Sequence, residues 1–256
     1  MKSFLAFFRK ELLASVRGGK ILIFGILFFA FGLMNPGIAK ITPWLLGFLS
    51  ESLEGTGMNI TTVTVSALDS WAQFFKNTQM ALIVFILLYG NIFTGEYGSG
   101  TLVLLLTKGL ARYKVIWAKA LTMLAVWTGG YFMSFGVTYV LNELLWDNAV
   151  AESLGISILY YWFFGVLMIA LTVLFSVIFS NYGFVLLGVG GFVMLMTLIG
   201  IAPKISRFLP TALMNGTYIV YGMNKASDFA VAAVIAAVIT VASFVASIFL
   251  MKKKQI

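Results

Sequence analysis

Apolar residues in this chain form long unbroken runs instead of alternating with polar residues. Six runs reach about 20 residues, the length that an α-helix needs to cross the hydrocarbon core of a bilayer. A transmembrane β-barrel would instead show segments of about ten residues with alternating polarity. The pattern predicts an all-α, polytopic membrane protein with six transmembrane helices. The predicted spans are residues 18–39, 74–93, 118–141, 156–179, 183–202 and 229–251.

The segments that connect the spans differ in length and polarity. The longest, residues 36–71, is rich in Thr, Ser and Gly, which predicts a partly ordered loop. Within it, residues 41–49 are apolar but short, which favours an interfacial segment over a span. Residues 203–228 contain apolar patches and predict short helices that dip into the membrane. For the first run a cleaved signal peptide is the alternative, although the preceding 20 residues are long for its basic region.

Composition supports a membrane location. Hydrophobic residues make up 61% of the 256 residues and charged residues only 10%, against about 25% charged residues in soluble domains. The chain has no cysteine and no histidine, which excludes disulfides, thiol nucleophiles and imidazole catalysis and removes the usual zinc ligands. An intramembrane protease therefore has no obvious catalytic set.

The net charge of +8 follows from an uneven distribution across the membrane. With both termini cytoplasmic, 12 of the 17 basic residues lie inside, as the positive-inside rule requires. We therefore predict a multi-pass protein of the cell (inner) membrane. The charge indicates anionic membrane lipids as partners and argues against nucleic acid. The inside set is Lys2, Arg9, Lys10, Arg17, Lys20, Lys108, Arg112, Lys114, Lys119, Lys252, Lys253 and Lys254.

The interiors of the predicted spans carry no Asp, Glu, Lys or Arg when Lys76 and Lys119 are assigned to the connecting segments. Carriers coupled to protons or ions normally place ionisable groups inside the bilayer. A carrier or channel that works without nucleotide is thus disfavoured. It stays open as an alternative, as does a membrane scaffold subunit.

Residues 1–20 are the first of two informative cytoplasmic segments. Phenylalanine and leucine recur at helical spacing and arginine and lysine lie between them, which predicts a basic amphipathic helix along the membrane. The residues that define it here are Phe8, Arg9, Lys10, Glu11 and Arg17.

Residues 95–117 are the second segment. Ser99 or Thr101 can cap a short helix at its start, and Gly109 can end it in a left-handed conformation. Three leucines, at positions 102, 105 and 106, then share one face. Such a face fits an apolar groove on a cytoplasmic partner. The alternative is that these leucines pack under the bundle.

The pattern Gly95-Glu96-x-x-x-Gly100-Thr101-Leu102, followed by Arg112 and Lys119, resembles the inner loop of ABC transporter permeases of the second exporter type, the ABC type-2 family. Residues 8–12 are similar to the N-terminal amphipathic helix of that family. The resemblance implies that the short helix couples to a separate ATPase subunit. Many relatives have a proline near residues 108–110, where this chain has Gly109. The implied coupling residues are Gly95, Glu96, Gly100, Thr101, Leu102, Leu105, Leu106 and Arg112.

The resemblance also implies a function for the whole chain as a single permease domain, residues 1–256. The sequence contains no Gly-x4-Gly-Lys-Ser/Thr phosphate loop, so we expect ATP and Mg on the partner ATPase and no cofactor on this chain. It is therefore not an enzyme by itself. We expect a second permease subunit, identical or related, and export of an amphipathic or hydrophobic cargo (peptide, drug or lipid-like) by alternating access.

Overall fold

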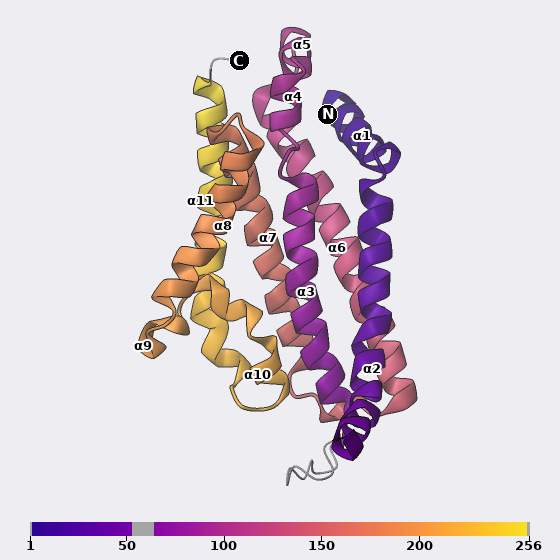
Figure 1. The fold of residues 1–256 in the computed structure, drawn as a ribbon. Helices are drawn as coiled ribbons and strands as arrows, with labels where there is room; N and C mark the ends of the chain where they lie inside the picture. The colour runs from indigo at the N-terminus through magenta and orange to yellow at the C-terminus, as the bar shows by residue number, and fades with distance from the viewer. Residues whose placement is uncertain (1, 53–63, 255–256) are drawn as a thin grey trace.

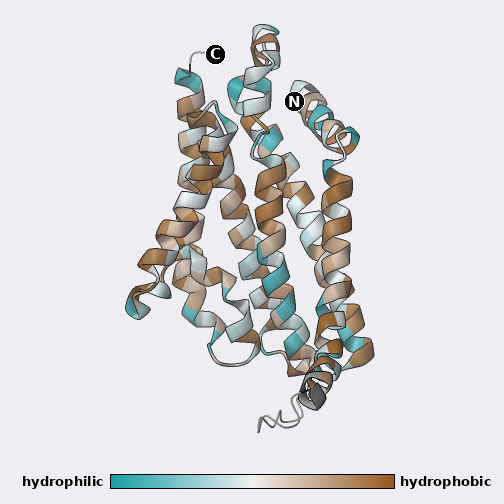
Figure 2. Ribbon diagram, in the orientation of Figure 1, coloured by the Kyte–Doolittle hydropathy of each residue, from teal (hydrophilic) through white to brown (hydrophobic). Residues whose placement is uncertain are grey.

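The computed structural model describes residues 2–52 and 64–254, which form a bundle of helices without β-strands (Figure 1). Within these residues six helices are long and apolar enough to cross a membrane, which confirms the predicted fold class. Figure 2 shows apolar residues along most of their length. The six are α2 (Lys20–Ser52), α3 (Ala67–Tyr89), α6 (Arg112–Leu145), α7 (Leu154–Ile178), α8 (Tyr182–Ile199) and α11 (Ala230–Lys253).

The N-terminal helix and the end of α11 lie at the same end of the bundle (Figure 1). This end also carries the segment between α3 and α6, and we call it the basic end. It holds α1 (Lys2–Arg17), α4 (Thr94–Gly98) and α5 (Thr101–Thr107). The two segments singled out from the sequence are thus neighbours in space.

The first span is longer than predicted. Helix α2 continues through Pro36 and Pro43, so the prediction that the span stops at residue 39 and that residues 41–49 form a separate interfacial segment is wrong. The predicted loop over residues 36–71 is also reduced, because α2 ends at Ser52 and α3 begins at Ala67. Residues 53–63 of that loop lie outside the described residues.

Hydrogen bonds from neighbouring helices explain why α2 survives Pro36. Proline has no N–H, so the carbonyl of Gly32 lacks its usual helical donor. The hydroxyl of Thr138 in α6 donates to that carbonyl at 3.2 Å. The same hydroxyl accepts a bond from Asn35 Nδ2 at 2.8 Å, and Asn77 Nδ2 of α3 donates to Asn35 Oδ1 at 2.7 Å. Partners on other helices compensate for a proline in this way inside membranes.

The core is mainly aromatic and centres on α7, whose most apolar stretch is 67% buried, compared with 11% for α8. Rings of α3, α6 and α7 contact one another at 5–7 Å, the range of favourable offset and edge-to-face geometry. Such packing fixes the relative position of these three spans. The rings are Trp71, Phe74, Phe85, Trp127, Tyr131 and Tyr161.

At the opposite end of the bundle, residues 203–229 form short helices, as the sequence predicts: α9 (Pro203–Ser206), η2 (Pro210–Met214), α10 (Gly216–Val220) and η3 (Ala226–Phe229). A further short helix, η1 (Asn148–Val150), follows α6. Tyr221 donates to Asp69 at 3.2 Å and Tyr160 to the carbonyl of Ala226 at 3.1 Å. These bonds hold the segment against α3 and α7.

Candidate functional site: the coupling segment and its ion cluster

Two glycines in the left-handed region delimit α5. Gly100 has φ 67° and forms its N-cap, and Gly109 has φ 84° directly after its end. Residues with a Cβ rarely adopt such angles. The predicted left-handed end at Gly109 is confirmed. The predicted caps are wrong, because the hydroxyls of Ser99 and Thr101 bond to each other at 2.9 Å and neither caps the helix.

The leucines of α5 pack mainly against the bundle. Leu102 is fully buried, and Leu105 and Leu106 are half-buried against the core. The alternative that these leucines lie under the bundle therefore describes them better than an exposed face. The exposed apolar side chains of α5 are instead Val103, 38% exposed, and Leu104, 62% exposed.

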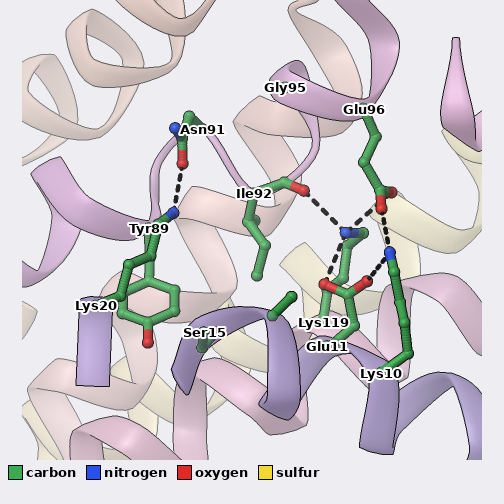
Figure 3. A pocket seen from close by; sticks show the side chains of 11 residues that line it. Lys10, Glu11, Ser15, Lys20, Tyr89, Asn91, Ile92, Gly95, Glu96 and Lys119 are labelled. Atoms are coloured by element: carbon green, nitrogen blue, oxygen red, sulfur yellow. Dashed lines mark hydrogen bonds and ion pairs between the residues drawn. The ribbon is translucent and has the colours of Figure 1, made fainter. Parts of the chain in front are cut away.

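A cluster of four charged side chains joins α1, α4 and α6, and we call it the ion cluster (Figure 3). The ammonium of Lys119 lies 3.0 Å from a carboxylate oxygen of Glu11 and 3.0 Å from one of Glu96. Lys10 lies 2.8 Å from Glu11 and 2.7 Å from Glu96. Each carboxylate is thus shared by two ammonium groups, and the cluster is formally neutral.

Burial makes the ion cluster costly to break. The side chain of Lys119 is 1% exposed and that of Glu11 is 7% exposed. Removing one partner of a buried pair leaves an uncompensated charge, at a cost of about 3–5 kcal/mol. Lys119 gains a further acceptor in the carbonyl of Ile92 at 2.9 Å. Beside the cluster lies a cavity of about 210 Å³ between α1 and the turn after α3.

Lys10 lies at the rim of the ion cluster. Burial alone would lower the pKa of Lys10, but hydrogen bonds and charges from Glu11 and Glu96 outweigh it and raise this pKa above the ordinary lysine value. Lys10 therefore keeps its positive charge at neutral pH.

Basic residues also cap the spans that end at the basic end. Lys20 donates to the carbonyl of Leu88 in the last turn of α3, and Lys254 donates to that of Val177 in the last turn of α7, both at 2.7 Å. Arg112 donates to carbonyls at the end of α11 at 2.5–2.6 Å. Cations are favourable there because the C-terminus of a helix carries partial negative charge. Some of the basic residues that were assigned to the cytoplasmic side thus also cap the ends of helices.

The predicted coupling residues fall into two groups. Glu96, with Gly95 beside the same cavity, lies at the ion cluster. Arg112 instead ties the end of the segment to α11. The segment is therefore held at its start by α1 and α6, and at its end by α11.

The residues that were predicted to define the N-terminal helix also fall into two groups, those that make contacts and those that are exposed. Lys10 and Glu11 join the ion cluster, and Phe8 stacks on Phe4 at 6.5 Å. Arg9 and Arg17 are exposed. The buried side of α1 is formed by Phe7, Glu11 and Ser15.

The central role of Lys119 was not predicted from the sequence. Lys119 was counted among the orienting cations and in the motif that follows Gly95, although it stands at the edge of the predicted span 118–141. A single lysine in such an apolar run indicates a buried partner. The two acidic residues on the inside, Glu11 and Glu96, were the available candidates.

Among the described residues, no group of three or more His, Cys, Asp or Glu side chains could hold a metal ion. In a comparison with known families, the sequence pattern of the family described as "ABC-2 family transporter protein" matches residues 5–253. No curated protein matches the chain. The family match runs from the first turns of α1 to the end of α11 and includes the whole coupling segment.

Proposed function

Because this chain belongs to the ABC-2 transporter family and is a permease subunit of an ABC transporter, we propose that it exports an amphipathic or hydrophobic cargo, driven by ATP that a separate subunit hydrolyses. The basic end faces the cytoplasm, since the lysines and arginines concentrate there. ATP and Mg bind to the partner ATPase, because this chain has no phosphate loop.

The ion cluster is the observation that carries this proposal. A permease that is driven by a separate ATPase subunit needs a rigid connection between the surface that contacts this subunit and the spans that move. Glu96 makes this connection at the start of the coupling segment through Lys119 of α6 and Lys10 of α1. Arg112 makes it at the end through α11. Motion of α5 is thereby passed to three other helices.

The ATPase docks on the exposed side of α5. Val103 and Leu104 are its exposed apolar side chains. A largely apolar cavity of about 390 Å³ lies between α1 and α5, with Phe7, Leu105 and Leu110 in its wall. A hydrophobic side chain from the ATPase fits there, because such grooves take apolar anchors.

A second permease packs against α8. This span is the least enclosed of the six, and Cβ atoms added at Gly190 and Gly191 would meet open space. Small residues let helices approach closely in membranes. ATP binding then closes the two ATPase subunits, and the two bundles move between inward-open and outward-open packings, each favoured by a different ligand state.

Co-purification with the ATPase from the same operon or cell tests the docking surface. We expect Leu104→Asp to abolish capture of the ATPase and Lys253→Asp, on the exposed end of α11, to leave it unchanged. Retention of the ATPase by Leu104→Asp would reject the docking surface. Glu96→Ala should keep the ATPase bound but lose ATP-driven transport in proteoliposomes. Transport by the purified chain without any ATPase would replace this proposal with the carrier alternative.

A further inference from the structure

Helix α3 is polar in the half that lies away from the basic end, as Figure 2 shows. Gln73, Lys76 and Gln79 follow one another at three-residue spacing on this half. These residues lie within α3 (Ala67–Tyr89), which belongs to one of the six candidate spans. Lys76 is therefore on a spanning helix and not in a connecting segment.

A cavity of about 260 Å³ opens beside these three residues, between α3 and the segment that contains η2 and α10. The other side chains in its wall include Phe75, Met214 and Thr217. Most of the lining is polar, in contrast to the lipid-facing surfaces around it.

The polar groups of this cavity have no partner among the described residues. Within residues 2–52 and 64–254, every ion pair belongs to the ion cluster, and Lys76 takes part in none of them. Asp69, two turns before Lys76, is bonded to the backbone of Ser66 and to Tyr221. An ionisable residue on a spanning helix is rare, and one without a partner is by default a functional-site hypothesis.

The donors in the cavity favour an anion. Lys76 supplies an ammonium group, the two glutamines supply amide N–H groups, and these donors suit the oxygens of a phosphate, sulfate or carboxylate. The exposed face of α3 then turns apolar towards the basic end. Met80 and Ile83 are each 55% exposed and Leu87 is 49% exposed. One helix face thus offers a charged pocket followed by an apolar strip.

We propose that this face binds a membrane amphiphile, with its anionic headgroup in the Lys76 cavity and its apolar chain along Met80, Ile83 and Leu87. The binding is a property of the permease alone and does not depend on the ATPase. If no amphiphile bound here, the proposed function would therefore still stand. If ATP-driven transport were not found, the binding site proposed here would still stand.

Native mass spectrometry of the purified permease tests the site by titration with phosphatidylglycerol and with phosphatidylcholine. We expect tighter binding of phosphatidylglycerol, and a loss of about fivefold to tenfold in Lys76→Gln, the effect of one missing charge-assisted contact. Lys76→Arg should bind as the wild type does. Lys204→Gln makes the same charge change on α9, away from the cavity, and should also have no effect.

Three results would overturn the proposal. The wild type could bind both lipids equally, or Lys76→Gln could keep the affinity of the wild type. Displacement of phosphatidylglycerol by millimolar inorganic phosphate would assign the cavity to a free anion instead of an amphiphile. Because Lys76 is exposed, the Gln variant should fold, and an unchanged circular dichroism spectrum checks this. Gln79→Leu tests the same cavity without a change in charge and should weaken binding by a smaller factor.

Discussion

Two regions of the bundle are held together by different chemistry. At the basic end, charges from α1, α4 and α6 meet in the ion cluster, and cations cap the ends of α3, α7 and α11. Around Pro36, midway along α2, uncharged amides and hydroxyls join α2, α3 and α6. Breaking a buried ion pair costs about 3–5 kcal/mol, whereas leaving an uncharged polar group unpaired costs about 1–3 kcal/mol. The region that receives force in our proposal should therefore lose more stability when one of its links is removed.

Of the substitutions considered, that of Lys119 should cause the largest loss of stability. Lys119→Ala leaves Glu11 and Glu96 buried with only Lys10 as a counter-ion, and we expect a loss of about 3–5 kcal/mol in stability. Thermal unfolding of the purified permease measures it. Lys114→Ala, five residues away on the same helix, is the matched control: Lys114 is half-buried and bonds only the hydroxyl of Ser3 among the described residues, so its loss should cost much less.

A charge exchange separates the ion pairs from the packing of their side chains. In the double variant Glu11→Lys with Lys119→Glu, the pair between positions 11 and 119 forms again with reversed polarity, although like charges then meet at Lys10 and at Glu96. The double variant should still lose less stability than the sum of the two single losses. Equal losses that simply add in the double variant would show that Lys119 and Glu11 do not interact.

In the network around Pro36, Asn35→Leu should lower the free energy of unfolding somewhat less than Lys119→Ala. The change removes the acceptor of Asn77 and a donor to Thr138, and each buried unpaired group costs about 1–3 kcal/mol. Thr138→Val should also destabilise, because it exposes the free carbonyl of Gly32 to an apolar side chain. Thr138→Ser retains the hydroxyl and is the control in the same unfolding measurement. If Val and Ser behaved alike, the hydroxyl would have no part in stabilising Pro36.

These two networks show what sequence can and cannot predict. Apolar runs give the spans directly, because the bilayer sets their length. The continuity of α2 depended on Thr138, 106 positions after Gly32, and the burial of Lys119 depended on Glu11, 108 positions before it. No local pattern contains such pairings. Pro36 and the glycine after it favour a helix end, and only the partner helices reverse that preference.

Within the basic end, Arg112→Ala should lower the free energy of unfolding by about 1–2 kcal/mol, which is less than the loss expected for Lys119→Ala. The guanidinium is partly exposed and holds only backbone carbonyls. Arg112→Lys should be intermediate, since one ammonium cannot reach as many carbonyls as the planar guanidinium. The informative measurement is the number of ATP molecules hydrolysed per cargo exported. We expect this ratio of ATP to cargo to rise in Arg112→Ala while the ATPase stays bound. An unchanged ratio would show that Arg112 plays no part in coupling.

Substitution of Lys10 should change the stability least, and the effect is best tested by its dependence on alkaline pH. The folded-state pKa of Lys10 is raised above its ordinary value of 10.5, so its stabilising contribution is complete below that value and is lost as pH rises through the folded-state pKa. The side chain is 48% exposed, and solvent screening keeps the effect small. The difference in Tm between wild type and Lys10→Gln should be constant from neutral pH to about pH 10 and should shrink above it. A difference that persisted at pH 12 would mean that Lys10 stabilises the ion cluster through packing of its aliphatic chain and not through its charge, since both its ion pairs and its cation–π contact with Phe7 at 5.1 Å need the ammonium.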